Sequence, residues 1–145
     1  METNEIILVG TQMKKLIEKK SAPIIRRYGL RPVELDILVF LYQSPRDTAK
    51  DIMSSRHFSK AHISKSIENL RSRGFVRLSE DSEDHRVVHI CLTGQTEEVV
   101  KEMIEVYQTC VQAVMKNITE EERMMMSRVW HKMLTGIDEE MKKFM

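Results

Sequence analysis

One glycine, Gly74, marks the point where the hydrophobic period of the chain changes from that of a helix to that of a strand. Before it, apolar residues recur at the spacing of one helix face: Ile63, Ile67 and Leu70. After it, two runs rich in β-branched and apolar residues, 75–78 and 87–92, flank the polar segment 79–86. A glycine is the usual residue for a left-handed helix end. We therefore predict a helix that stops at Gly74 and leads into a two-stranded hairpin with a polar tip.

Two helices are expected before this one. Arg31-Pro32 follows the turn Tyr28-Gly29-Leu30, and a proline is well tolerated in the first helical position. The buried face of that helix is predicted to consist of Leu35, Leu38, Val39 and Tyr42. Thr48 can cap a short next helix with Asp51 as its capping-box partner, and Ser59 is the expected N-cap of the helix that ends at Gly74.

Longer helices are expected on both sides of this central region. The first runs from Glu5 to about Arg27, with an interruption near Pro23. Thr93 is the expected cap of a long later helix whose apolar stripe comprises Met103, Tyr107, Cys110, Val111, Val114 and Ile118. Thr119 opens a last helix with the stripe Met126, Val129, Met133, Ile137 and Met141.

Charge is distributed unevenly along a chain whose net charge is only +1. The segment from Arg56 to Arg77 contains six basic residues and one acidic residue, whereas residues 97–145 contain seven basic and ten acidic residues. The near-neutral total therefore hides a local basic segment, which indicates a localised anionic ligand.

The helix that ends at Gly74 offers polar side chains to such a ligand. If its apolar stripe faces inward, the side chains of Ala61, His62, Ser64, Lys65 and Asn69 face solvent. The predicted order is a helix, a short helix, a helix that ends at a glycine, and then a hairpin. This is the order of a winged helix-turn-helix, which places its last helix in the major groove of DNA. Lys65 can bind phosphate or guanine there, and Ser64 and Asn69 can bond base edges or phosphate.

The hairpin tip, Asp81-Ser82-Glu83-Asp84-His85-Arg86, is acidic and by charge alone a poor DNA ligand. Asp84 and Arg86 stand two residues apart, so the carboxylate can hold the guanidinium in one orientation. An arginine oriented in advance enters a narrow minor groove at lower entropic cost.

The region from about Pro32 to Thr93 resembles the winged-helix domain of the MarR family of bacterial transcriptional regulators. The resemblance rests on the order and spacing of three motifs: a recognition helix at 59–70, the turn Arg73-Gly74-Phe75-Val76, and Asp84-x-Arg86 followed by Leu92-Thr93. It implies that Arg86 contacts DNA and that Asp84 orients it. Together with the helix residues, the expected DNA-binding set is Ser59, Lys60, Ala61, His62, Ser64, Lys65, Asn69, Asp84 and Arg86.

The predicted fold is mainly α with a small β-hairpin wing, flanked by N- and C-terminal dimerisation helices. Its expected parts are residues 1–30 for dimerisation, 31–93 for DNA binding and 94–145 for dimerisation, because the flanking helices carry more apolar surface than the small domain can cover. We expect a homodimer on a palindromic operator. The resemblance implies a repressor and a small-molecule effector. The alternative is a winged-helix interaction module for an acidic protein partner.

Other classes of function lack a matching pattern. Five histidines (His57, His62, His85, His89 and His131) and two cysteines (Cys91 and Cys110) invite a metal site, but a second pair at ligand spacing is missing. Phosphate-loop and hydrolase motifs are also missing, so we expect neither an enzyme nor a cofactor. The chain has no apolar window of membrane-spanning length and no signal pattern, which predicts a cytoplasmic protein without a membrane partner.

Overall fold

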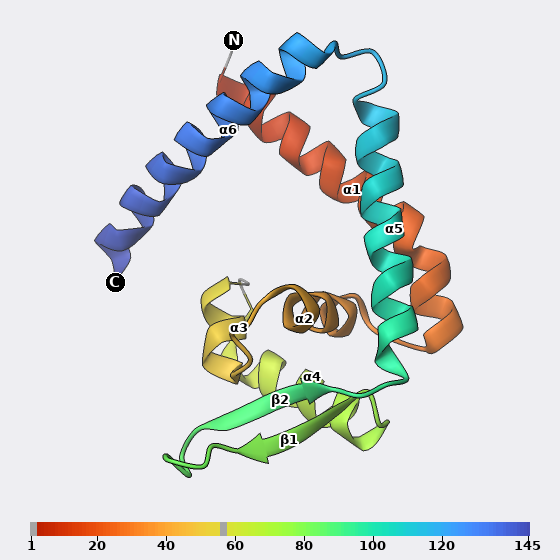
Figure 1. Cartoon of the computed structure of the whole chain (residues 1–145), viewed down its shortest axis with the longest axis vertical. Coiled ribbons are helices and arrows are strands. Elements are labelled where there is room, and N and C mark those ends of the chain that lie inside the picture. Colours follow the sequence, from red (N-terminus) through yellow and green to blue (C-terminus); the bar gives the residue numbers. More distant parts are fainter. Residues whose placement is uncertain (1–2, 56–57) are drawn as a thin grey trace. The chain divides into compact units, whose positions relative to one another are not determined.

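The computed structural model describes residues 3–55 and 58–145 (Figure 1). Arg56 and His57, which entered the charge and histidine counts, lie outside the described residues. The elements in chain order are α1 (Thr3–Tyr28), α2 (Pro32–Gln43), α3 (Ala49–Ser55), α4 (Lys60–Ser72), β1 (Val76–Glu80), β2 (Val88–Leu92), α5 (Thr96–Val114), α6 (Glu120–Met141) and the short 3₁₀ helix η1 (Lys142–Phe144). The predicted fold class, mainly helical with one hairpin, is therefore confirmed.

The chain forms two compact units, Met1–Cys110 and Val111–Met145, and the boundary between them falls inside α5. The first unit contains the core, and most residues of α2 are buried in it. Ile37 and Leu38 of α2 are fully buried, as are Ile52, Ile63 and Leu70 of α3 and α4. The three helices of the central region thus share one apolar interior.

The prediction that Tyr42 belongs to the buried face of α2 is wrong, because its side chain is 45% exposed. The other three members of that face, Leu35, Leu38 and Val39, are buried. The difference arises because α2 is surrounded on nearly all sides, with Ile37, Phe40 and Leu41 buried as well. A helix buried all round has no single apolar stripe for the sequence to reveal.

Both ends of α4 follow their sequence signals. The hydroxyl of Ser59 accepts a hydrogen bond from the backbone N–H of His62 at 3.1 Å, which confirms the N-cap. Gly74 has a φ of 81°, and the N–H groups of Gly74 and Phe75 donate to the carbonyls of Arg71 and Leu70 at 3.1 and 2.9 Å. These two hydrogen bonds form a Schellman motif, so the helix stop at Gly74 is also confirmed.

The hairpin leads directly out of this helix end. Strands β1 and β2 pair antiparallel with Val76 opposite Leu92 and Glu80 opposite Val88. Figure 1 shows the hairpin beside α4, with its tip pointing away from the start of α5. The hairpin contacts α2 and α4, and the buried side chains of Val76 and Ile90 join the core. Residues 81–87 connect the two strands and form the tip of the wing.

Helix α1 runs through Pro23 without a break, so the predicted interruption there is wrong. A proline inside a helix removes one backbone hydrogen bond, but the buried neighbours Ser21 and Ile24 hold this stretch against the rest of the first unit. The helix ends at Tyr28 and is followed by Gly29, whose φ is 63°. There the guanidinium of Arg73, at the end of α4, donates to the carbonyls of Tyr28 and Gly29, both at 2.6 Å.

Thr93 does not cap α5, contrary to the prediction. Its hydroxyl donates to the carbonyl of Gly74 at 2.7 Å, because strand pairing places Thr93 beside the end of α4. Helix α5 begins three residues later, at Thr96, whose buried hydroxyl donates to the carbonyl of Phe75. It ends at Val114, before Ile118, so its apolar stripe is shorter than predicted.

The second unit contains α6, whose first turn is capped as predicted. The hydroxyl of Thr119 accepts from the N–H of Glu122, and the carboxylate of Glu122 accepts from the N–H of Thr119. None of the 22 residues of α6 is buried. Large apolar side chains remain exposed along it: Met124, Met125, Val129, Trp130, Leu134, Ile137 and Met141.

Candidate nucleic-acid interface

The first two turns of α4 present a continuous exposed surface. All six of the predicted contact residues before Ser66 are exposed: Ser59, Lys60, Ala61, His62, Ser64 and Lys65. The ring of His62 meets the ring of Phe58 edge to face, with 5.4 Å between the centroids, which restrains the His62 side chain. Small, hydroxyl and lysine side chains on one helix face can lie against a groove edge and donate to phosphate or base atoms.

Asn69 lies apart from this surface. Its side-chain amide donates to the carboxylate of Glu34, a residue of α2 with only 1% of its surface exposed. The same carboxylate accepts the backbone N–H of Arg31 at 2.8 Å and so caps the start of α2. The structure therefore places Asn69, half-buried, at the junction of α2 and α4, whereas the helix pattern indicated a fully solvent-facing side chain. Glu34 is a positioning residue that sequence spacing could not reveal, because it lies 35 residues from Asn69.

Glu68 is the one acidic side chain of α4, and Arg71 neutralises it. The two side chains form a two-point ion pair, with Arg71 Nε donating to Glu68 Oε2 at 2.9 Å. This hydrogen bond lowers the pKa of the Glu68 carboxyl. The pairing of Glu68 leaves Lys60 and Lys65 as the charges that determine the sign of the exposed α4 surface.

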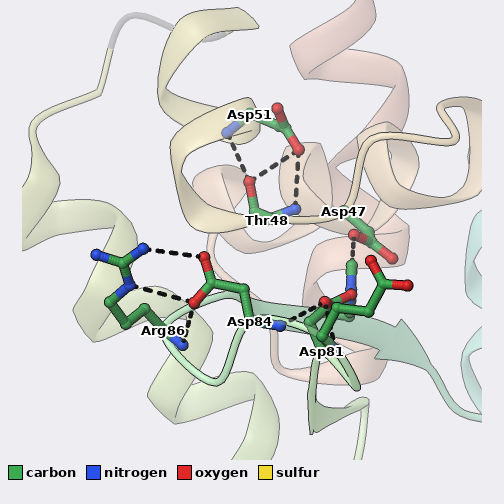
Figure 2. A network of polar contacts seen from close by, with 8 residues as sticks. Asp47, Thr48, Asp51, Asp81, Asp84 and Arg86 are labelled. Carbon is green, nitrogen blue, oxygen red and sulfur yellow. Dashed lines mark hydrogen bonds and ion pairs between the residues drawn. The ribbon is translucent and has the colours of Figure 1, made fainter.

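At the wing tip, the carboxylate of Asp84 holds the guanidinium of Arg86 from the side. Figure 2 shows the two groups facing each other, with Arg86 Nε and Nη2 at 3.2 and 3.3 Å from the two carboxylate oxygens. The backbone N–H of Arg86 also donates to Asp84 at 3.0 Å, and the ion pair lowers the pKa of the Asp84 carboxyl. The Arg86 side chain is 91% exposed, so it is oriented by Asp84 while still open to a ligand.

A second carboxylate, that of Asp81, organises the tip from inside. Its Oδ2 atom accepts the N–H groups of Glu83 and Asp84, each at 3.0 Å, and its Oδ1 atom lies 2.8 Å from Nε2 of His89. The hydrogen bond with His89, followed by those two N–H groups, lowers the pKa of the Asp81 carboxyl. Two of the three acidic groups of the tip, Asp81 and Asp84, are thus directed at donors of the protein itself.

His89 joins the tip to the segment that precedes α3. Its Nδ1 atom lies 2.7 Å from Oδ1 of Asp47, and the backbone N–H of Ile90 donates to the Asp47 carbonyl at 2.9 Å. The hydrogen bonds with Asp47 and then with Asp81 raise the pKa of the half-buried His89 ring. The sequence pattern offered His89 only as a metal ligand, and its partner Asp47 lies 42 residues away, beyond any local pattern.

The segment that bears Asp47 is itself firmly capped. Thr48 and Asp51 exchange three hydrogen bonds, drawn in Figure 2, of which the shortest joins Thr48 Oγ1 to Asp51 Oδ2 at 2.8 Å. The predicted capping pair is therefore confirmed. The hydroxyl of Thr48 lowers the pKa of the Asp51 carboxyl. Asp47 consequently projects from an ordered helix start.

Neither a metal cluster nor a membrane span is found in the part of the chain that the structure describes. Over residues 3–55 and 58–145, no three His, Cys, Asp or Glu side chains are grouped so that they could hold a metal ion. No helix among the same residues has the length and apolar character needed to cross a bilayer. Both ring nitrogens of His89 are engaged by carboxylates, and the Cys110 thiol is buried.

A comparison with known protein families gives a match over the segment that forms these helices and the wing. The model of the MarR family matches residues 28–87, which span α2, α3, α4, β1 and the wing tip. The chain contains a MarR-family winged-helix domain. The match includes every predicted contact residue from Ser59 to Arg86, and the family resemblance of the sequence motifs is thereby confirmed.

Solved structures extend the likeness in fold beyond the winged domain. A MarR protein from Peptoclostridium difficile superposes with a TM-score of 0.82 at 21% identity, covering 100% of this chain and 94% of that one. BpsR of Bordetella bronchiseptica, a protein whose DNA binding is regulated by 6-hydroxynicotinic acid, gives a TM-score of 0.68 at 20% identity, covering 91% and 92%. A curated relative, the uncharacterized HTH-type transcriptional regulator YdgJ of Bacillus subtilis (strain 168), is 23% identical over 110 residues, or 76% of this chain and 67% of YdgJ.

Proposed function

We propose that this protein is a homodimeric transcriptional repressor that binds a palindromic DNA operator through α4 and the wing. The observation that carries the proposal is the Asp84–Arg86 pair, which keeps an arginine 91% exposed and oriented at the tip of an otherwise acidic wing. Such a pair has no evident use inside the folded chain. It suits a narrow, negatively charged minor groove.

Helix α4 supplies the contacts to the major groove in this proposal. Ala61 allows the helix backbone to approach, Ser59 and Ser64 bond phosphate or base edges, and Lys60 and Lys65 bind phosphate or guanine. His62, restrained by Phe58, lies on the same exposed surface. Asn69 is left out of this contact set because its amide is held by Glu34.

The apolar side chains of α1 and α6 support the dimer. Ile7, Leu8 and Val9 of α1 are at least 56% exposed, and Trp130 and Leu134 of α6 are 45% and 58% exposed. Exposed apolar surface of this extent is typical of a subunit interface. A two-fold axis would place two recognition helices about 34 Å apart, on successive turns of one face of DNA.

Regulation by a small ligand is a further part of the proposal. The support is the likeness to BpsR, whose DNA binding responds to 6-hydroxynicotinic acid. A ligand that prefers one spacing of the recognition helices would change the affinity for DNA. We infer that the protein works in the cytoplasm, where an operator is accessible. A screen of small aromatic acids that leaves operator affinity unchanged would count against the ligand step.

The decisive experiment is selection of bound duplexes from random DNA, followed by affinity measurements across a range of salt. We expect a palindromic consensus that is preferred at least about 1000-fold over random duplex. Lys65→Ala should weaken binding and reduce its salt dependence, and Arg86→Ala should cost about 1–3 kcal/mol of binding free energy. Lys101→Ala, which removes an exposed lysine from α5, is the matched control and should change neither.

The same experiment separates the two classes of function. Binding without sequence preference, and unaffected by Lys65→Ala and Arg86→Ala, would overturn DNA recognition. It would favour instead an interaction module for an acidic protein partner. A monomeric mass by sedimentation at micromolar concentration would overturn the homodimer.

A further inference from the structure

His89 lies outside the proposed DNA-contact surface, yet its ring links the wing tip to the segment that precedes α3. We propose that His89 is a positioning residue for Arg86, acting as a bridge between Asp47 before α3 and Asp81 in the tip. The proposal rests on the DNA-binding function proposed above. It adds a residue that none of the recognised motifs includes.

The bridge is one end of an unbroken series of polar contacts that reaches Arg86. Asp47 Oδ1 lies 2.7 Å from His89 Nδ1, and His89 Nε2 lies 2.8 Å from Asp81 Oδ1. The other oxygen of Asp81 accepts the backbone N–H of Asp84, whose carboxylate in turn holds the guanidinium of Arg86. Figure 2 shows Asp81, Asp84 and Arg86 in this order along the tip. A displacement of Asp81 therefore displaces the backbone that carries the Asp84–Arg86 pair.

The bridge requires a particular protonation state of the ring. Each ring nitrogen faces a carboxylate oxygen, and only the imidazolium, which has two N–H donors, can donate to both. A neutral ring would turn a lone pair toward one of the two carboxylates. The hydrogen bonds with Asp47 and Asp81 raise the pKa of His89, so the bridging cation persists to a higher pH than an ordinary histidine allows.

Other charged groups of the tip are engaged elsewhere. Glu80 on β1 faces His85, with its Oε2 atom 3.2 Å from His85 Nδ1. Asp84 faces Arg86. The carboxylates that face His89 are Asp47, from the segment between α2 and α3, and Asp81, from the tip. The two ends of the bridge thus belong to different parts of the winged domain.

The direction of the pH effect follows from these contacts. The pKa of His89 in the folded protein is raised above that of the unfolded chain, so the bridge contributes fully below the ordinary histidine pKa. It is lost as the pH rises through the raised value. The wing tip should therefore be most firmly held in mildly acidic solution, at a pH above that at which the carboxylates are protonated, and become looser in alkaline solution.

The first test requires no DNA and no substitution. An NMR titration of the wild-type protein between about pH 5.5 and 9 should show a His89 ring that titrates above the usual histidine value. The backbone amides of residues 81–86 should shift with the same midpoint. Tip amides that do not follow the His89 titration would overturn the bridge, whatever the protein binds.

The second test measures the affinity for the selected duplex over the same pH range. Wild type should lose roughly five- to tenfold in affinity as His89 is deprotonated, an effect comparable to the net contribution of one ordinary hydrogen bond. His89→Gln should bind at all pH values like wild type at high pH. His85→Gln, the same substitution at an exposed histidine of the same tip, should follow wild type.

The variants separate the effect of His89 from that of the remaining histidines and from a folding defect. A loss shared by all three proteins comes from neither His89 nor His85, and only the difference between variants counts. Asp47→Asn keeps the His89 ring and should reduce the pH dependence in the same way, so a folding defect specific to His89→Gln can be recognised. If His89→Gln retains the wild-type pH profile, the proposal is overturned. If wild type binds no duplex at any pH, the DNA-binding function fails and the NMR titration alone decides the role of His89.

Discussion

Helices α2 and α6 carry apolar side chains in quite different settings. Eight of the twelve residues of α2 are buried within the first unit, whereas α6 has none among its 22. The core of the winged domain is therefore completed by its own chain. The apolar face of α6 is not covered by its own unit, and in our proposal a second copy of the chain covers it. The two regions should respond differently to the same kind of substitution.

The largest effect is expected from a truncation inside α2. Leu38→Ala removes a fully buried side chain and should lower the free energy of unfolding by about 2–5 kcal/mol, since the core cannot close the cavity completely. Tyr42→Ala on the same helix should change it by less than about 1 kcal/mol, because Tyr42 is exposed. Chemical denaturation at a fixed protein concentration measures both. Equal losses would contradict the contrast within α2.

The next effect concerns α6 and association. Leu134→Glu places a carboxylate on the exposed apolar face and should weaken dimerisation by about 30-fold or more, because an unpaired charge is costly to bury. Helix content should remain, since Leu134 is not part of the core. Sedimentation and circular dichroism measure the two quantities. Lys132→Glu, on the opposite side of the helix, should leave the dimer in place, and a dimer unaffected by Leu134→Glu would disprove this interface.

Replacing a glycine by alanine should have opposite effects on stability at Gly74, after α4, and at Gly136, inside α6. Gly74→Ala should destabilise the protein by about 1–2 kcal/mol, because φ is 81° and the added Cβ would lie 3.2 Å from the Gln95 side chain. Gly136→Ala, inside α6 and with open space around it, should stabilise by about 0.5–1 kcal/mol. Thermal unfolding of the two variants should thus give shifts of opposite sign. Shifts of the same sign would contradict either the left-handed backbone at Gly74 or the position of Gly136 inside α6.

The smallest effect is expected at the capping pair of α3. Asp51→Asn removes the carboxylate charge from the first turn of α3 and should cost about 0.3–1 kcal/mol of unfolding free energy at neutral pH. The pKa of Asp51 is lowered in the folded protein, so its contribution is present above the ordinary carboxyl pKa and is lost as the pH falls through the lowered value. The difference between wild type and Asp51→Asn should accordingly shrink in acid. A difference independent of pH would mean that the carboxylate charge has no part in the cap.

Features that depend on neighbouring residues were predictable from the sequence. The cap at Ser59, the stop at Gly74, the Asp84–Arg86 pair and the capping box at Thr119 each involve groups close together along the chain, and each is present. Their physical basis is local backbone geometry. The sequence therefore contains enough information to place the recognition helix and the wing along the chain.

Features that depend on tertiary packing were missed or misjudged. The Glu34–Asn69 and Asp47–His89 contacts join residues 35 and 42 positions apart, and no spacing rule connects them. The cap predicted at Thr93 is wrong because the hydroxyl's partners, the carbonyls of Gly74 and Phe75, come near it only when the strands pair. In each case a polar side chain forms a hydrogen bond with a residue that is distant in the sequence.

Arg73 gives the recognition helix a mechanical link to α1. It is the C-cap of α4, and its guanidinium donates to the carbonyl of Tyr28, the last residue of α1, and to that of Gly29 in the following turn, both at 2.6 Å. A relative displacement of about 1 Å would carry these bonds to the limit of hydrogen-bond range. Arg73 therefore fixes the position of the C-terminal end of α4 against the turn that ends α1.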